Sequence, residues 1–298
     1  MLSFGVSFMA DPPVSEVVRR TVLAEQNEFS HAWLWDSHVL WQEVYPIFTL
    51  MAAGTDQIHI GPCVTNPVTR DPTVTAAAMA TLNEISGGRM EMAIGRGDSA
   101  QRVLGRKPVP VAEMERACVL IRDLAEGREV DLDGTPVRLK WSEGHRLPVW
   151  VAAYGPLALR CAGRVADGVV LQLADPFIIE WALRYIREGA QQAGREFGEI
   201  KLMAAAPAYI SADLAHPGDR GPVFRLRGAI PLGVLLGAEV RPVEDLLETD
   251  DLSALARGVG DHLDVLVHRV LLGHVGLCLD QRSADLTHGY ALLSACLS

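Results

Sequence analysis

The sequence predicts an α/β protein of the (β/α)8-barrel type. Short apolar runs alternate with helical patterns through the first 210 residues, which implies parallel strands joined by helical crossovers. A segment rich in Gly, Pro, Asp, His or Asn follows six of the predicted strands. Such loops converge on one mouth in a barrel, whereas a doubly wound sheet concentrates its ligand at one switch point. The spread of these segments favours the barrel, and a length of 298 residues permits it.

β-Branched and aromatic residues mark the predicted strands, and apolar spacing with capping signals marks the helices. The strands are expected at 2–8, 31–35, 57–61, 90–95, 148–153, 168–173 and 201–210. One helix is expected to begin with Ser15 as its N-cap, and the others span 44–53, 73–85, 111–126, 157–165 and 177–193. The segment near 127–147 interrupts this order with a D-G turn between alternating runs, which predicts a hairpin insertion.

Composition excludes several classes of partner. Lys and Arg number 27 against 37 Asp and Glu, a net charge of −10, and no basic stripe could neutralise phosphates, so no nucleic acid is expected. The late apolar run at 263–279 contains charged residues, and no membrane span is expected. The five cysteines are widely spaced without a C-x-x-C pair, and the N-terminus lacks signal-peptide features. We therefore expect a cytoplasmic protein.

The segment Ile94–Ala100 directly follows a predicted strand and reads G-x-G-x-x-A. This spacing occurs in dinucleotide-binding folds, but there it belongs to the first βαβ unit and is followed by an acidic residue at the end of the next strand. Here it follows the fourth strand. It therefore indicates either a phosphate-holding turn of another kind or a plain tight turn.

Candidate proton-transfer groups stand after two of the predicted strands, one of them in this same segment. His38 follows the strand at 31–35 and titrates near neutral pH, and Asp98 would serve if burial raised its pKa. For each, a structural role such as turn or helix capping is the alternative. No histidine spacing of the H-E-x-x-H type occurs, and the sequence predicts no metal site.

Three runs resemble the bacterial-luciferase-like flavin and deazaflavin oxidoreductases. They are 61–105, beginning GPCVTNP and containing GGRMEMAIGRGDS, then 116–139, and 147–176, containing VAAYGP and GVVLQLADP. The similarity is greatest to the coenzyme F420-dependent branch, which includes methylenetetrahydromethanopterin reductase-like and glucose-6-phosphate dehydrogenase-like members. The resemblance covers roughly residues 2–215 and implies a barrel whose mouth binds the cofactor, in a homo-oligomer, a dimer in the family.

The resemblance also implies roles for individual residues. His38 would donate a proton, and Asp98 matches a catalytic acid where the sugar-phosphate branch has Glu. The resemblance implies a non-prolyl cis peptide at Cys63–Val64 that bulges towards the cofactor ring, and a contact between Asn66 and that ring. It also implies a cofactor-binding turn at Arg96 and Gly97, and a segment from Tyr154 to Pro156 that binds the cofactor phosphate. The implied cofactor-binding set is Asp36, Cys63, Val64, Asn66, Arg96, Gly97, Tyr154, Gly155, Pro156 and Gln172.

Three departures from the family pattern qualify these expectations. Asp175 stands where sugar-phosphate members have Lys, and Ser37 is an extra residue between Asp36 and His38. Resemblance is lost after His216, so we expect one luciferase-like barrel domain over 1–298, with 1–216 recognisable and 217–298 a divergent tail. A divergent ending and a shifted reading frame both fit this tail, and the C-terminal closure is expected to be atypical, whether or not it is complete.

The sequence thus predicts an F420-dependent oxidoreductase that transfers a hydride between the deazaflavin and a small organic substrate. Two alternatives stay open. One is a luciferase-like monooxygenase that uses FMN and oxygen, and the other is a cofactor-binding barrel without turnover.

Overall fold

The computed structural model describes residues 2–11, 13–172, 175–208 and 291–297. Eight strands form one sheet in the order β3-β2-β1-β10-β9-β8-β7-β4. The strands are β1 (Leu2–Phe8), β2 (His31–Leu34), β3 (His59–Pro62), β4 (Met92–Ile94), β7 (Val149–Ala152), β8 (Gly168–Gln172), β9 (Lys201–Ala208) and β10 (Ala291–Leu297).

The two edge strands of this order are also joined to each other. Ile60 bridges Met90, and Thr65 bridges Ile94, both in parallel fashion. Within this sheet the described pairs among β1, β2, β3, β4, β7, β8 and β9 are parallel, while β10 pairs antiparallel with both β1 and β9. The barrel-type α/β fold predicted from the alternation of elements is confirmed.

One strand departs from the (β/α)8 pattern. Where that pattern has a parallel eighth strand, β10 runs antiparallel, a pairing that satisfies the same backbone groups. The atypical closure expected of the tail stays a prediction, because residues 209–290 lie outside the described residues. The predicted division at residues 216 and 217 lies outside the described residues and stays a prediction.

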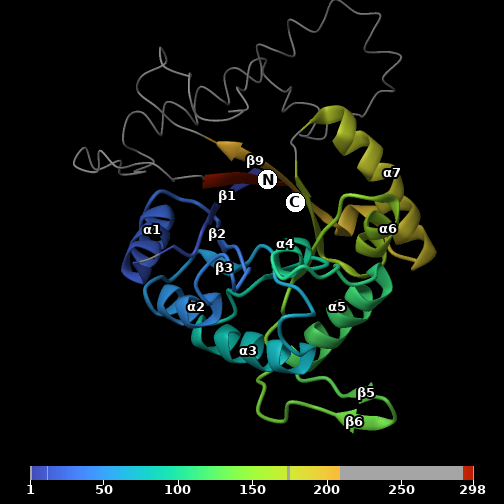
Figure 1. The fold of residues 1–298 in the computed structure, drawn as a ribbon, viewed down its shortest axis with the longest axis horizontal. Coiled ribbons are helices and arrows are strands. Elements are labelled where there is room, and N and C mark those ends of the chain that lie inside the picture. The colour runs from blue at the N-terminus through green and yellow to red at the C-terminus, as the bar shows by residue number, and fades with distance from the viewer. Residues whose placement is uncertain (1, 12, 173–174, 209–290, 298) are drawn as a thin grey trace, which may run out of the picture.

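The helices form an arc around the strands (Figure 1). Five of the six predicted helices begin within one residue of the predicted position, whereas α1 starts at Val14 with Pro13 in the capping position, so Ser15 is not its N-cap. A short helix after β4 was not predicted. The helices are α1 (Val14–Gln26), α2 (Val44–Ala53), α3 (Pro72–Ile85), α4 (Asp98–Arg102), α5 (Val111–Ala125), α6 (Pro156–Val165), α7 (Pro176–Gln192) and the 3-10 turn η1 (Phe197–Glu199).

Two layers of apolar residues hold this arrangement. The larger lies between strands and helices, and a smaller cluster around Trp33 and Trp150 fills the space enclosed by the strands. A Cβ on Gly168 would lie only 2.2 Å from the Trp150 ring, so the indole requires glycine on the neighbouring strand. None of the helices among the described residues is both long and apolar enough to cross a membrane.

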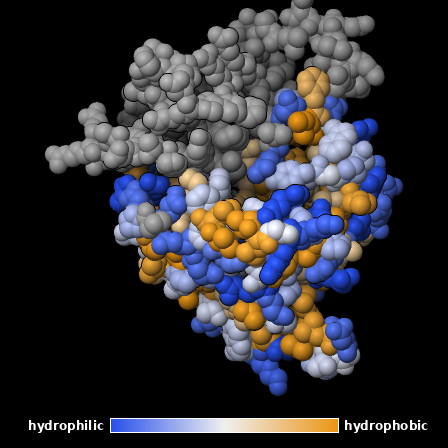
Figure 2. Space-filling view, viewed as in Figure 1, coloured by the Kyte–Doolittle hydropathy of each residue, from blue (hydrophilic) through white to orange (hydrophobic). Residues whose placement is uncertain are grey.

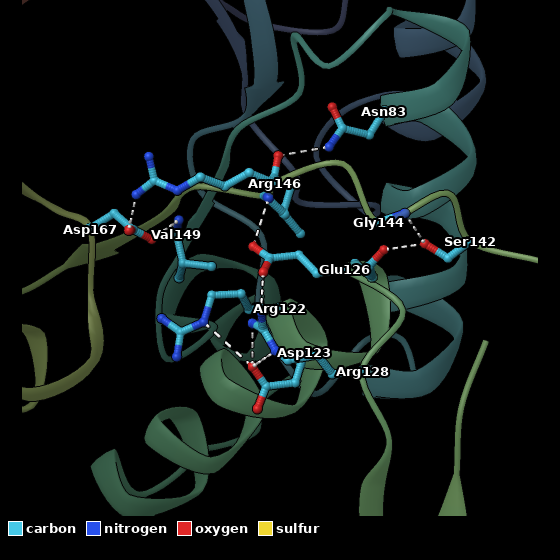
Figure 3. A network of polar contacts seen from close by, with 12 residues as sticks. Asn83, Arg122, Asp123, Glu126, Arg128, Ser142, Gly144, Arg146, Val149 and Asp167 are labelled. Carbon is cyan, nitrogen blue, oxygen red and sulfur yellow. Dashed lines mark hydrogen bonds and ion pairs between the residues drawn. The ribbon is translucent and has the colours of Figure 1, made fainter. Parts of the chain in front are cut away.

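The predicted insertion is confirmed as a hairpin of β5 (Val130–Leu132) and β6 (Thr135–Val137) that projects from the helical arc (Figure 1). The chain returning from it is anchored by the polar network of Figure 3. Asn83 donates to the Arg146 carbonyl at 2.9 Å, and Glu126 accepts from the Leu147 amide at 2.9 Å. The Asp167 carboxylate accepts hydrogen bonds from both the Arg146 guanidinium and the Val149 amide. These bonds fix the start of β7.

Candidate active site

The carboxyl ends of the strands carry most of the predicted site residues. The segment after β2 contains Asp36, the segment after β3 contains Cys63 to Asn66, and the segment after β4 begins at Gly95. Gly155 follows β7, and Gln172 ends β8. Because neighbouring parallel strands end at the same side of a barrel, these segments share one mouth.

A buried hydrogen-bonded chain lies beneath the mouth. Asp36 is only 8% exposed, and its Oδ2 accepts from the Thr65 hydroxyl at 2.7 Å. The Tyr45 hydroxyl lies 3.3 Å from the same Thr65 oxygen and can donate to it. Burial raises the pKa of Asp36, while the hydrogen bond from Thr65 opposes this rise. Burial also raises the pKa of Tyr45 to about 12, so this phenol stays protonated.

The loops after β3 and β4 touch each other. The peptide bond between Cys63 and Val64 is cis, as the family resemblance implied. A Cβ on Gly95 would lie 3.1 Å from the Val64 side chain, and one on Gly97 would lie 3.2 Å from the Asn66 Cβ. Gly97 also has a φ of 81°, in the left-handed region that favours glycine. The two predicted cofactor loops are therefore in contact only because both positions lack a side chain.

Asn66 and Arg96 are each partly committed to the protein. Asn66 is 2% exposed, and its Oδ1 accepts from the backbone amides of Val68 and Thr69, so its amide nitrogen is the end that remains for a ligand. Arg96 donates through Nε to the Val109 carbonyl at 2.6 Å, which turns its side chain towards the loop that precedes α5.

The two predicted proton donors differ in setting. Asp98 begins α4 and pairs with Arg102 at 3.2 Å, while its side chain stays 47% exposed. His38 is exposed in the turn that follows Asp36. A hydrogen bond of 2.8 Å between the Ser37 and Ser99 hydroxyls ties the segment that contains His38 to the start of α4. The structure thus brings the two segments together at the mouth.

The segment after β7 presents backbone to the mouth. Gly155 is the N-cap of α6 and supplies no side-chain hydrogen bond, and Pro156 stands in the first helical turn. A Cβ on Gly155 would meet nothing within 4 Å. The first amides of α6 therefore have no side-chain cap, which is the arrangement that receives phosphate at a helix N-terminus. Tyr154 lies beside it, and burial raises the pKa of its phenol to about 12, with Cys63 and Asp98 adding to the effect.

A cavity of about 450 Å³ opens next to this segment. Its walls come from the ends of β7 and β8 and from the first turns of α6 and α7, and they are almost entirely apolar. Figure 2 shows hydrophobic residues gathered at the start of α7 and again over α4. The lining residues are Ala153, Tyr154, Leu159, Leu171, Gln172, Phe177, Ile178, Trp181 and Ala182.

Sequence reasoning missed two members of the buried chain. Thr65 lies inside the loop that was singled out, yet only the structure shows its bond to Asp36. Tyr45 lies on α2 with the spacing of an ordinary core residue, and no sequence signal could have marked it.

Comparison with known proteins gives consistent matches. A family model described as luciferase-like monooxygenase matches residues 2–216. The 5,10-methylenetetrahydromethanopterin reductase of Methanolobus tindarius is 33% identical over 72% of this chain and 67% of its own length. The F420-dependent glucose-6-phosphate dehydrogenase of Beutenbergia cavernae is 30% identical over 91% of this chain and 88% of its own.

A solved structure agrees with these sequence matches. The coenzyme F420-dependent tetrahydromethanopterin reductase of Methanopyrus kandleri superposes with a TM-score of 0.62 and 26% identity, over 92% of this chain and 81% of that one.

Proposed function

Because this chain belongs to the luciferase-like monooxygenase family, we propose that it is an F420-dependent oxidoreductase that transfers a hydride between the deazaflavin and a small organic substrate. One observation carries the proposal. The loop from Cys63 to Asn66 and the turn from Gly95 to Gly97 are in contact at the mouth, close enough to require glycine in the turn. The names of the relatives that bind F420 support the choice of cofactor.

The residues present fit an elongated, phosphate-bearing cofactor. The uncapped amides after Gly155 would receive the phosphate, with Tyr154 and Gln172 along the tail. Val64 and the amide nitrogen of Asn66 would contact the ring. The apolar cavity beside Tyr154 would exclude water from one side of this path.

When bound, F420 supplies the carbon that gives or accepts the hydride. The chain's own work is to orient the reactants and to move the accompanying proton. We assign that proton to His38 or Asp98. Asp36 would hold the base of the mouth together through Thr65 while lying beside the ring and substrate.

Asp175 bears on whether the substrate carries a phosphate group. Its carboxylate accepts from the Ile178 amide at 3.0 Å and caps α7, at the position where sugar-phosphate members of the family carry Lys. A carboxylate there would repel a phosphorylated sugar. We therefore propose a substrate without a phosphate group. We also propose that the protein acts as a cytoplasmic homo-oligomer.

A fluorescence titration of the purified protein with F420 and, separately, with FMN tests the cofactor. Saturable binding of F420, with FMN at least about tenfold weaker, is expected. Tight FMN binding without an F420 response would instead favour the monooxygenase. Turnover that persists in both His38→Ala and Asp98→Asn would show that the proton is carried by another group.

A further inference from the structure

A second polar cluster lies at the opposite end of the strands from the mouth. His31 begins β2, His59 begins β3, and Glu91 stands just before β4. Along β2, His31 precedes Asp36 by five residues, or roughly 16 Å of extended chain. None of the three has a part in the proposed reaction, so this cluster can be judged apart from it.

The carboxylate of Glu91 faces both imidazoles. The His31 Nε2 lies 3.6 Å from Glu91 Oε2, and the His59 Nδ1 lies 3.4 Å from Glu91 Oε1. Taking one ligand atom from each of the three residues, these atoms all lie within 4.8 Å of one another. Ligand atoms of a tetrahedral zinc, at bond lengths of about 2.1 Å, stand about 3.4 Å apart. The two imidazole–carboxylate distances are therefore close to those around a single metal ion, and the third ligand pair lies within 4.8 Å.

Three buried nitrogens in this cluster have no hydrogen-bond partner. Among the described residues, only three buried side-chain polar atoms lack one, namely His31 Nε2, His59 Nδ1 and Trp33 Nε1. All three belong to one cluster, since the Trp33 ring stacks on His31 at 5.4 Å and His31 stacks on His59 at 5.1 Å. Buried polar atoms normally have a partner, and the two imidazole nitrogens, unlike the donor-only Trp33 indole, can bind a metal ion.

Local hydrogen bonding fixes which nitrogen of His31 is free. The Ser30 hydroxyl donates its one hydrogen to the Phe4 carbonyl at 2.8 Å. The same oxygen, 2.8 Å from His31 Nδ1, must therefore accept from that nitrogen. In the neutral imidazole this leaves a lone pair on Nε2, aimed at a carboxylate oxygen. Two electron-rich atoms then face each other unless a proton or a metal cation stands between them, and a metal ion would serve His31 and His59 at once.

Further contacts hold Glu91 in place while leaving a route to it. The Trp150 indole donates to Glu91 Oε2 at 2.5 Å, and the Glu91 side chain is 4% exposed. The His59 side chain is 43% exposed, so an ion can reach the cluster past it. Nitrogen ligands select transition metals over calcium and magnesium. An orienting hydrogen bond on the distal His31 nitrogen is the usual support of a metal-bound imidazole.

We propose that His31, His59 and Glu91 bind one divalent transition-metal ion of the zinc class at the amino end of β2, β3 and β4. The ion would link three strands at the place where β3 and β4 are joined only by isolated bridges. Its role is structural, because it lies far from the mouth.

Zinc titration of the full chain, freed of metal by a chelator, tests the site. His59→Gln removes a half-exposed ligand, and Glu91→Gln keeps an acceptor for Trp150. His145→Gln is the matched control, because His145 forms a pair with Glu143 at 3.5 Å but has no third ligand among the described residues. Calorimetry gives the number of zinc ions bound, and the thermal midpoint shows whether zinc stabilises the fold.

The expected result is that wild type and His145→Gln bind one more zinc ion than the two ligand variants, and that zinc raises the thermal midpoint only in those two proteins. Comparing variants separates this site from the other histidines and cysteines of the chain. Equal zinc binding and equal thermal shifts in wild type and His59→Gln would overturn the proposal, even if Glu91→Gln failed to fold. No stabilisation of wild type by zinc would also overturn it.

Discussion

The two ends of the strands place polar groups in different ways. At the mouth, the polar groups lie on loops that follow the strands. The backbone of these loops has no side-chain cap at Gly155 and adopts a left-handed conformation at Gly97. At the amino end, they lie on or directly beside the strands, and Glu91 is packed among tryptophans and histidines with 4% of its side chain exposed. The mouth thus presents open loop backbone, whereas the amino end holds its carboxylate buried between strands.

This difference separates function from stability. Loops after strands can change without disturbing the sheet, as is general for barrel enzymes. Groups between strands are constrained by close backbone approach, and a change there alters the packing of the sheet itself. Substitutions at the amino end should therefore cost stability, and substitutions at the mouth should cost binding.

The largest effect is expected for Gly61→Ala in β3. A Cβ there would lie 1.8 Å from the Glu91 carbonyl oxygen, and backbone cannot yield as a side chain can. We expect a loss of about 3 kcal/mol or more in the free energy of unfolding, measured by urea denaturation. Gly198→Ala, which meets nothing within 4 Å, is the control. Equal stability of the two variants would contradict the tight contact of β3 and β4.

Asn83→Ala tests the polar support beneath β4. This buried amide accepts from the Met90 amide at 3.0 Å and donates to the Arg146 carbonyl, as Figure 3 shows for the second bond. Its removal leaves two buried backbone groups unpaired, and we expect a loss of about 1–3 kcal/mol in the same denaturation assay. The exposed neighbour variant Glu84→Ala should change stability far less. A loss of the same size in both would assign the effect to helix α3 as a whole.

Gly97→Ala should weaken F420 binding by about tenfold, equivalent to about 1.4 kcal/mol, because the new methyl group pushes Asn66 out of place. Gly105→Ala is a matched control, since Gly105 also has a positive φ, of 69°, but has nothing within 4 Å of its Cβ position. Fluorescence titration measures both. If the two variants lose affinity equally, the loss comes from the strain of a side chain at positive φ and not from the contact with Asn66.

The smallest effect, one of pH, is expected for Asp36→Asn. A folded-state pKa above the ordinary 3.8 means that the folded protein binds this proton more tightly than the unfolded chain. The stability that this tighter proton binding gives the folded state is fully present below pH 3.8 and is lost as pH rises through the folded-state pKa of Asp36. Asp36→Asn should therefore gain stability relative to wild type as pH rises from 4 towards 7. A difference between the two thermal midpoints that is constant with pH would contradict the raised pKa.

The sequence predicted the mouth better than the amino end for a physical reason. Each mouth residue follows a recognisable strand, so alternation of elements alone places Asp36 and Gly97 at one face. The metal ligands come from three separate strands, spaced 28 and 32 residues apart, and no short motif joins them. Thr65 and Tyr45 meet only through the packing of α2 against β3, which periodicity does not specify.

Other differences concern elements whose form depends on neighbours. The antiparallel direction of β10 depends on its pairing with β1 and β9, which local sequence does not encode. The five-residue helix α4 is too short to show a helical period. The hairpin of β5 and β6, in contrast, was predictable because its D-G turn is a local signal: Asp133 and Gly134 both have positive φ.

The most direct test of this division is the F420 titration of Gly97→Ala, Gly105→Ala and Asn83→Ala, at a temperature where all three are folded. We predict that Gly97→Ala alone loses affinity, by about tenfold, while Asn83→Ala binds F420 like wild type despite its lower stability. Affinity that falls in step with stability across the three variants would contradict the separation of a binding mouth from a stabilising amino end.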